Sequence, residues 1–338
     1  MRRVEVKKVD VFTIKPFCGN PAGVVTQADG LSLDDMRHVA GEMSLSECAF
    51  ISSAKSSKCD YRVRFFTQST ELDLSGHVLI ASCFSMMEEG RIPVSHGFNT
   101  YKVETNVGVV PVVANITPIE GTEDAAAGDA TGVEFRSGGR VIGNLESIMM
   151  HQVQSNYRPA DISVDELADI LGIDRSEITH TGLPIEIAPH GLVQLVVPVR
   201  SSETLLGMHP DLIRLNLLNR KHGIDISDIF TTDTVSQDCT VYSRHFAPSI
   251  GLWEDPGSGS GAACLCAYLV KHGLLNPGTM IVEQGNNPAC LVRIHVEVGR
   301  ADGEKIPVSV GGLAVTSIIQ TVEVEGAPDG GAARTSSP

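Results

Sequence analysis

Carboxylates beside turns are the residues of this sequence best suited to acid–base chemistry. Asp73 and Asp255 each follow a strand-like stretch and come shortly before a glycine, with Glu71 and Glu254 beside them. Glu47 stands between a helical pattern and an apolar strand pattern, where a side chain is partly buried. Burial raises the pKa of a carboxyl group, as a base that moves protons near neutral pH requires. We therefore predict proton transfer with Glu47 as the first candidate; a capping or surface role is the alternative.

Two stretches that contain these carboxylates resemble each other. Residues 64–77 contain RFFTQS followed by DLSGH, and residues 244–261 contain RHFAPS followed by DPGSGSG. In each, a strand pattern passes through an acidic residue into a glycine that opens an apolar segment. We predict a duplication whose copies each end at a helix N-terminus, where free backbone N–H groups can bind an anion. Chance similarity between short turns is the alternative.

Length and charge limit the class of protein. The 338 residues predict two domains, each large enough to bury its own core. The formal net charge of −15 argues against nucleic-acid binding, because phosphate contacts need clustered Lys and Arg. No apolar run approaches the roughly 18 residues that span a bilayer, and the first residues form a strand pattern without a signal-peptide core. We expect a soluble cytoplasmic protein that binds neither membrane nor nucleic acid.

Cysteine and histidine spacing indicates neither disulfides nor metal sites. The eight cysteines are scattered without C-x-x-C pairs, and the eleven histidines show no H-x-x-x-H spacing. Free cysteines in apolar surroundings usually behave as small core residues. We therefore expect no metal ion and no disulfide.

Short strands and a few helices must position the candidate residues. A Ser-x-x-acid pattern at Ser32 predicts a helix that ends near Ser44, just before Glu47. Gly108 predicts a bend within a strand at 100–113, and the composition of 116–139 predicts a linker. The other predicted strands are 4–14, 62–66, 192–199, 239–246, 280–284, 292–298 and 306–310, and the other predicted helices are 163–171, 211–218 and 262–272.

Eight segments together resemble the phenazine-biosynthesis PhzF-like isomerase family. They occur in the family's order across roughly 300 residues, and a chance match of all of them is very improbable although each alone is weak. The segments are Gly19-Asn20-Pro21-Ala22, Leu45-Ser46-Glu47-x-Ala49-Phe50, Arg64-x-Phe66-Thr67, Asp73-Leu74-x-Gly76-His77, Arg244-x-Phe246-Ala247-Pro248, Glu254-Asp255-Pro256-x-Ser258-Gly259-Ser260, Glu283-Gln284-Gly285 and Gly311-Gly312-x-Ala314-Val315.

The resemblance implies the diaminopimelate-epimerase-like fold. In this α/β (α+β) fold, two similar domains each wrap a curled, mostly antiparallel sheet around a central helix, with the active site in the interdomain cleft. We expect an N-terminal domain at 1–120, with a strand at 306–324 returning to it, and a C-terminal domain at 134–305. Residues 327–338 are expected to be a disordered tail. The resemblance also implies a homodimer.

The resemblance further implies a function and the residues that perform it. It implies a cofactor-independent isomerase of secondary-metabolite biosynthesis that shifts a double bond in a small carboxylated, cyclic metabolite. Glu47 matches the family's proton-shuttling glutamate, and His77 and Asp255 match the residues that hold and polarise the substrate. The matching substrate-binding positions are Asn20 and Ser46 in the cleft and Gly76, Ser258, Gly259 and Ser260 at the helix entries.

Departures from the family pattern keep two other functions open. Ser75 and Asp255 stand where related epimerases and racemases use paired cysteines, so a two-thiol mechanism is disfavoured. Ser44, Cys48 and Gly261 also differ from the common family residues, and 132–161 has no assigned role. The alternatives are an amino-acid or hydroxy-acid epimerase or racemase, and a non-catalytic small-molecule binding protein. For His77 and Ser260, packing or helix capping without ligand contact is the alternative.

Overall fold

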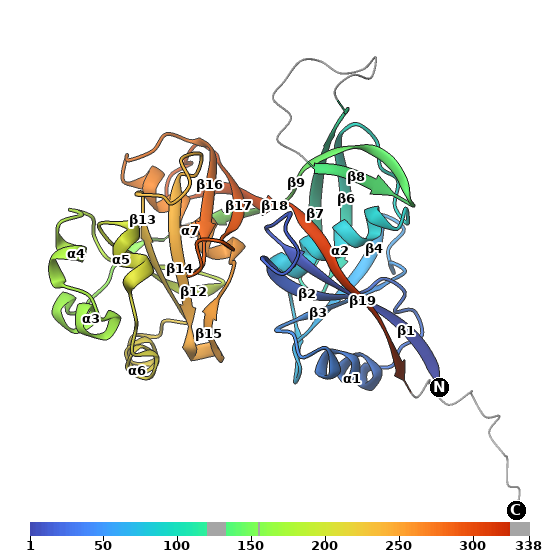
Figure 1. The fold of residues 1–338 in the computed structure, drawn as a ribbon, viewed down its shortest axis with the longest axis horizontal. Helices are drawn as coiled ribbons and strands as arrows, with labels where there is room; N and C mark the ends of the chain where they lie inside the picture. Colours follow the sequence, from blue (N-terminus) through green and yellow to red (C-terminus); the bar gives the residue numbers. More distant parts are fainter. Residues whose placement is uncertain (120–132, 155, 325–338) are drawn as a thin grey trace, which may run out of the picture.

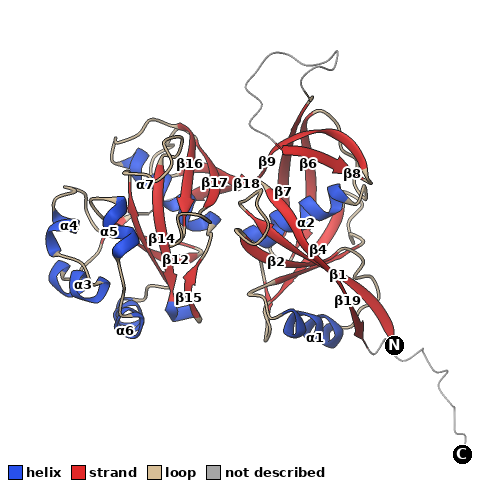
Figure 2. Ribbon diagram, in the orientation of Figure 1, coloured by secondary structure: helices blue, strands red, loops and turns tan. Residues whose placement is uncertain are grey.

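Two sheet-rich halves lie side by side in the computed structural model, each wrapped around one central helix (Figures 1 and 2). The structure describes residues 1–119, 133–154 and 156–324. The central helices are α2 (Gly76–Glu88) and α7 (Gly259–Lys271). Both are buried along most of their length, as expected for helices with apolar residues on all sides. The predicted mixed fold of two similar α/β domains is confirmed.

The first half contains the strands from both ends of the chain and one outer helix, α1 (Leu33–Met43). Its strands are β1 (Arg2–Val11), β2 (Asn20–Val25), β3 (Cys48–Ser52), β4 (Tyr61–Phe66), β5 (Glu71–Leu72), β6 (Gly97–Thr105), β7 (Gly108–Thr117), β8 (Val133–Ser137), β9 (Arg140–Gln154) and β19 (Ala314–Val324).

The second half contains the remaining strands and four more outer helices. Its strands are β10 (Arg158–Pro159), β11 (Glu186–His190), β12 (Leu192–Pro198), β13 (Ile226–Thr231), β14 (Val241–Ala247), β15 (Leu252–Asp255), β16 (Gly278–Gln284), β17 (Val292–Val298) and β18 (Ile306–Gly312). Its outer helices are α3 (Val164–Leu171), α4 (Arg175–Thr179), α5 (Ser202–Gly207) and α6 (Leu212–His222), with a 3₁₀ turn η1 at Pro248–Ile250. In the described part of the chain, no helix has the length and apolar character needed to cross a bilayer.

The two halves repeat one order of strand pairings, which confirms the predicted duplication. From β1 through β2, β3, β4, β6 and β7 to β9, the pairs are antiparallel, parallel, antiparallel, parallel, antiparallel and antiparallel. From β11 through β12, β13, β14, β16 and β17 to β18, the same sequence of pairs recurs. The central helices α2 and α7 follow β5 and β15, the equivalent short strands.

The strand registers correct the equivalence that the sequence suggested between Asp73 and Asp255. Across the β4–β5 pair Phe65 faces Leu72, and across the β14–β15 pair His245 faces Asp255. Leu72 is therefore the counterpart of Asp255, and the glutamates one residue earlier are counterparts of each other. Asp73 itself is exposed in the turn before α2.

Glu71 and Glu254, which the sequence placed among the candidate carboxylates, form ion pairs within their own halves. The distance from Nε to Oε1 is 2.8 Å both in Arg64–Glu71 and in Arg244–Glu254. Each guanidinium also lies 5.1 Å from the ring centroid of the phenylalanine two residues later. The Arg64 hydrogen bond lowers the pKa of Glu71, so this carboxylate stays ionised. These two glutamates stabilise strand ends.

A backbone ladder joins the two halves. The C-terminal part of β9 pairs with β18, while residues 144–150 of β9 pair with β7. β8 and the start of β9 extend the first sheet. β19 returns to the first half and pairs with β1 along its whole length. Of the expected linker at 116–139, residues 120–132 lie outside the described residues, as does the expected tail at 327–338.

Local capping signals placed the outer helix α1 correctly, but one turn differs from its prediction. Ser32 and Asp35 form the reciprocal capping box, and Ser44 ends α1 in the left-handed conformation at φ 52°. Gly108 was expected to bend one strand. It instead begins β7 at φ 112° after a tight hairpin from β6, a backbone conformation that glycine adopts readily.

The expectation that the chain has no disulfide was wrong. Cys18 and Cys290 are bonded, with their Cα atoms 4.8 Å apart and a sequence separation of 272 residues. Cys18 lies in the loop before β2 and Cys290 in the loop before β17, and these loops touch where the two halves meet. Spacing could not reveal the pair because only the packing of the halves brings the loops together.

Protein prepared without reductant should expose six thiols per chain to a thiol reagent after denaturation, since six cysteines are free. Reduction before denaturation should raise the number to all eight cysteines. As a control, Cys18→Ser should expose its seven remaining cysteines without reductant, because Cys290 loses its partner. Eight thiols in the unreduced wild-type protein would contradict the bond.

Candidate active site

The first turns of the two central helices converge on one point of the junction. A Cβ atom on Gly76 would lie 3.3 Å from Sδ of Met150, and one on Gly259 would lie 3.6 Å from Val310. Met150 and Val310 are register partners across β9 and β18. Because helix N-termini present unpaired backbone N–H groups and positive dipole ends, this convergence favours an anion between the halves.

Glu47 and His77 lie together beside this convergence. Oε2 of Glu47 is 4.0 Å from Nδ1 of His77, and the two side chains are 22% and 13% exposed. Within the described residues, Oε2 of Glu47 and Nε2 of His77 are buried atoms that have no hydrogen-bond partner. Such atoms are costly to leave unpaired, so a bound molecule is the expected partner for both.

Asp255 approaches this pair from the second half and is held by Asn20 of the first. The amide Nδ2 of Asn20 donates to Oδ1 of Asp255 at 2.9 Å and to the carbonyl oxygen of Gly257 at 2.7 Å. The backbone N–H of Gly257 donates to the same Oδ1 at 3.1 Å. Burial raises the pKa of Asp255, and the nearby charge of Glu47 raises it further, while His245 and His77 oppose the shift.

Phe12 supports the loop that contains Asp255. Its ring would lie 3.1 Å from a Cβ atom on Gly257, a tight contact that favours glycine there, and at an ordinary 3.6 Å from one on Gly259. Phe12 is buried in the left-handed conformation at φ 65°, and its backbone bonds Leu313 and Arg293 at 2.7 Å each. The bond to Arg293 ties the first half to β17 of the second.

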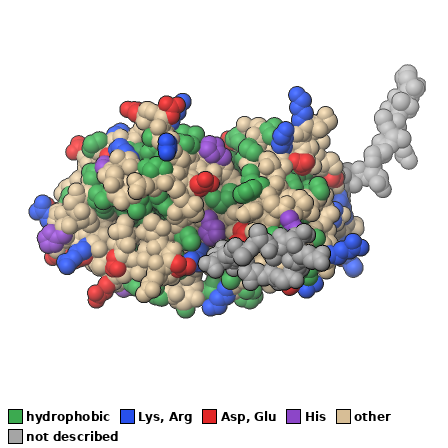
Figure 3. Space-filling model, turned by 90° about the horizontal axis from the view of Figure 1, so that it is seen from above, with side chains coloured by type: hydrophobic (Ala, Val, Ile, Leu, Met, Phe, Trp, Pro, Cys, Tyr) green, Lys and Arg blue, Asp and Glu red, His purple; other side chains and the backbone are tan. Residues whose placement is uncertain are grey.

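The remaining predicted substrate-binding residues lie at the start of α7 and beside Glu47. Oγ of Ser258 accepts from the N–H of Gly261 at 3.2 Å and lies 3.2 Å from Oγ of Ser260, so Ser258 caps α7. Gly259 and Ser260 are partly exposed at the helix start. Ser46 is exposed beside Glu47. On the face seen in Figure 3, histidine and acidic side chains gather along the border between the halves.

A buried Asp228–His245 pair beneath α7 was missed at the sequence level. Nδ1 of His245 lies 2.6 Å from Oδ1 of Asp228, and the side chains are 2% and 1% exposed. A Cβ atom on Gly261 would lie 2.7 Å from that oxygen and 2.8 Å from that nitrogen. The only sign of this pair in the sequence was that Gly261 differs from the common family residue. Glycine is needed there because a larger side chain would overlap the pair. Although burial lowers the pKa of His245, the charge of Asp228 raises it overall.

No metal-binding cluster of three or more His, Cys, Asp or Glu side chains occurs among the described residues. The groups gathered at the junction are instead a carboxylate and an imidazole from the first half and a second carboxylate from the other half. Together with the helix N-termini, they can exchange protons with a bound anion and fix its position.

One family model matches nearly the whole of the two-half architecture. Residues 9–319 match the PhzC-PhzF model, described as phenazine biosynthesis-like protein. This chain belongs to the PhzC-PhzF family. The match includes both halves of the duplication and the β9–β18 junction.

One curated relative and two solved structures show how similar this PhzC-PhzF family member is to known proteins. The uncharacterized isomerase YfhB of Bacillus subtilis (strain 168) is 29% identical over 332 residues, covering 96% of this chain and 100% of that protein. The PhzF-family phenazine biosynthesis protein of Bacillus anthracis has a TM-score of 0.79 at 25% identity, covering 96% and 100%. A hydroxyproline epimerase from Agrobacterium vitis, with a TM-score of 0.57 at 16% identity and coverage of 95% and 92%, shares the fold alone. The chain is an isomerase of this family.

Gly261→Ala should destabilise the protein by about 1–3 kcal/mol, because the added methyl group overlaps Asp228 and His245. Gly41→Ala is the matched control, since a Cβ atom there meets nothing within 4 Å and lies within α1. That control should stabilise by about 0.5–1 kcal/mol through helix propensity and reduced chain entropy. Urea denaturation measures both, and equal effects would show that the Asp228–His245 pair does not need glycine.

Asp255→Asn should become increasingly more stable than the wild type as the pH rises from acidic to neutral. The folded pKa of Asp255 is raised mainly by burial, so ionisation costs the folded state more than the unfolded state. Below the ordinary aspartate pKa both proteins are neutral at this position and should differ least. Denaturation curves at several pH values measure the difference in free energy of unfolding, and a difference that shrinks with rising pH contradicts the assignment.

Proposed function

We propose that this isomerase moves a proton between two carbon atoms of its substrate through Glu47 and so shifts a double bond. The observation that supports this proposal best is the unpaired, buried Oε2 of Glu47 beside the unpaired Nε2 of His77. A carboxylate oxygen that no group of the protein hydrogen bonds is free to approach a C–H group of a bound substrate. Its position at the junction places it where a substrate would contact both halves.

In this mechanism, Glu47 acts first as a base and then as an acid. Its carboxylate removes a proton from one carbon, the electron pair of the broken C–H bond moves into the substrate's π system, and the double bond shifts. The carboxyl group then returns the same proton to another carbon, so the net reaction is isomerisation. Nδ1 of His77 lies 4.0 Å from Oε2 of Glu47. His77 can therefore hydrogen bond to a substrate oxygen on which negative charge develops during the proton transfer.

A carboxylate on the substrate fits the convergent helix starts. The starts of α2 and α7 meet at the Met150–Val310 pair, and the side chain of Ser75 makes no capping bond in α2. The Asn20–Asp255 hydrogen bond fixes the opposite wall. We therefore propose a small carboxylated, cyclic metabolite as substrate. From the family resemblance we also propose that the protein forms a homodimer.

The residues at the two helix starts argue against a two-thiol epimerase. The N-cap positions of α2 and α7 are Ser75 and Ser258. Cys48 follows Glu47 directly, but burial raises the pKa of its thiol to about 12, so no thiolate forms there near neutral pH. An epimerase would have to use other bases, and a non-catalytic binding protein would have no need of a base such as Glu47.

Glu47→Gln should slow isomerisation about 10²- to 10⁴-fold, the usual loss for a well-placed acid–base group. The protein is incubated with cyclic β,γ-unsaturated carboxylates, and NMR follows double-bond position, while parallel reactions in D₂O follow deuterium uptake. Glu42→Gln is the matched control, because Glu42 is exposed on α1. It should retain the wild-type rate.

Three results would count against the proposal. An undiminished rate in Glu47→Gln would remove Glu47 as the base. Inversion at a stereocentre without movement of the double bond, seen by chiral chromatography, would favour the epimerase. Saturable binding of these acids without any turnover would favour the non-catalytic binder.

A further inference from the structure

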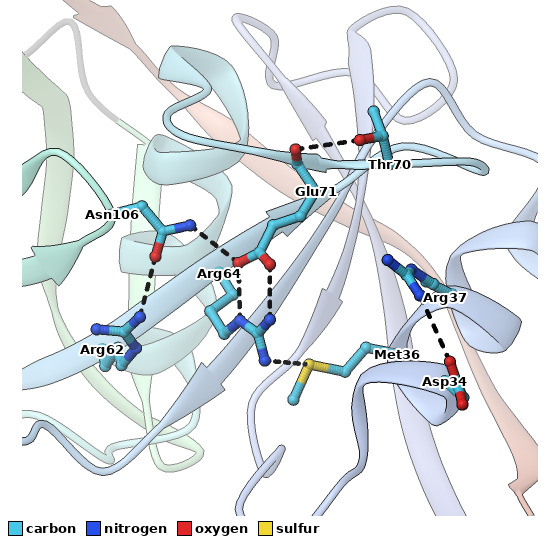
Figure 4. Close-up of polar contacts among 8 residues, drawn as sticks. All are labelled: Asp34, Met36, Arg37, Arg62, Arg64, Thr70, Glu71 and Asn106. Carbon is cyan, nitrogen blue, oxygen red and sulfur yellow. Dashed lines mark hydrogen bonds and ion pairs between the residues drawn. The ribbon is translucent and has the colours of Figure 1, made fainter.

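A cavity lies in the first half, and its lining includes none of the residues Glu47, His77 and Asp255. Its volume is about 570 Å³, within the range of small-molecule sites. Arg62, Arg64 and Lys55 line it together with Glu71 and Asn106, and Leu31 and Met36 form an apolar wall. None of the predicted active-site residues lines this cavity. Figure 4 shows four of its polar residues, Arg62, Arg64, Glu71 and Asn106, with Arg64 next to Met36 of α1.

The duplication provides an internal reference for Arg64. Arg244 occupies the equivalent position, with the same glutamate partner and the same phenylalanine contact. Nη1 of Arg244 donates to the carbonyl oxygens of Leu205 and Met208 at 2.8 and 2.7 Å. Those oxygens belong to α5 and its C-terminal end, which cover this guanidinium.

The first half lacks these two acceptors. Nη1 of Arg64 has the thioether sulfur of Met36 at 3.6 Å as its acceptor, and sulfur accepts hydrogen bonds weakly. The Arg64 side chain is 25% exposed, whereas that of Arg244 is 7% exposed. The cavity therefore lies beside the Nη1 edge of Arg64. In the second half, two carbonyl oxygens cover the same edge of Arg244.

Most other charged groups around the cavity already make hydrogen bonds within the protein. Arg62 bonds Glu104 at 2.7 Å and Asn106 at 2.9 Å, and Asn106 donates to Glu71. The carboxylate of Asp29 accepts the N–H of Ser53 at 3.0 Å. Lys55 is exposed, and its ammonium group makes no ion pair with the described residues. The groups left for a ligand are thus the Arg64 edge, a lysine and an apolar wall.

We propose that this cavity binds a small organic carboxylate whose oxygens take the place that the Leu205 and Met208 carbonyl oxygens occupy in the second half. The carboxylate accepts from Nη1 of Arg64 and attracts the ammonium group of Lys55, since charge-assisted bonds to arginine are the strong ones. The apolar part of the ligand packs on Leu31 and Met36. Binding here is independent of the reaction proposed at Glu47.

Benzoate and benzamide, which have nearly the same shape, provide the test. In protein labelled with ¹³C at the methionine methyl groups, benzoate should shift the Met36 signal in a saturable way, while Met43 on the same helix serves as the internal control. Benzamide should bind about tenfold more weakly, because it lacks the charge. Glu47→Gln should leave the benzoate titration unchanged, which separates this site from the active site.

Charge reversal tests the lysine. Lys55→Glu should weaken benzoate binding about tenfold, whereas Lys58→Glu, an exposed change in the same loop but outside the cavity, should not. Three results would overturn the proposal: no saturable shift of Met36, equal binding of benzamide, or equal effects of the two lysine variants. Thermal denaturation of each variant verifies that the fold is retained.

Discussion

The pairing of β9 with β18 is the constraint on which the rest of the structure depends. These are the last strands of the two repeats, and their ladder makes one continuous sheet out of two curled ones. Each repeat places its central helix against its own last strand. Joining those strands therefore brings the starts of α2 and α7 to the Met150–Val310 pair, and the functional groups follow from that convergence. Side-chain contacts such as Asn20–Asp255 then fix the halves in detail.

The duplication also shows which positions build the scaffold and which have diverged for chemistry. The Arg–Glu ion pair and its phenylalanine occur in both halves with nearly identical geometry, because the same strand end must be stabilised twice. At the junction the halves differ: Leu72 is the counterpart of Asp255, and only the first half supplies Glu47 and His77. One scaffold thus presents a base from one side and a second carboxylate from the other.

Sequence patterns predicted what depends on neighbours along the chain and missed what depends on packing. The capping residues Ser32 and Asp35 identified the start of α1. The repeated Arg-x-Phe motif identified the duplication. The Cys18–Cys290 bond and the Asp228–His245 pair join residues that only the folded sheets bring together. The pairing of β9 with both β7 and β18 likewise joins segments far apart in the sequence, so local patterns do not reveal it.

The buried Asp228–His245 pair is difficult to explain by stability alone. Removing two charges from water costs free energy that their mutual attraction often only offsets, and Oδ2 of Asp228 stays unpaired among the described residues. The pair acts on its neighbour instead. His245 faces Asp255 across the β14–β15 ladder, and its charge lowers the pKa of Asp255 against the effect of burial. The histidine therefore opposes the effect of burial on the carboxyl group whose Oδ1 accepts from Asn20 and Gly257, and so links a pair buried beneath α7 to the wall of the site.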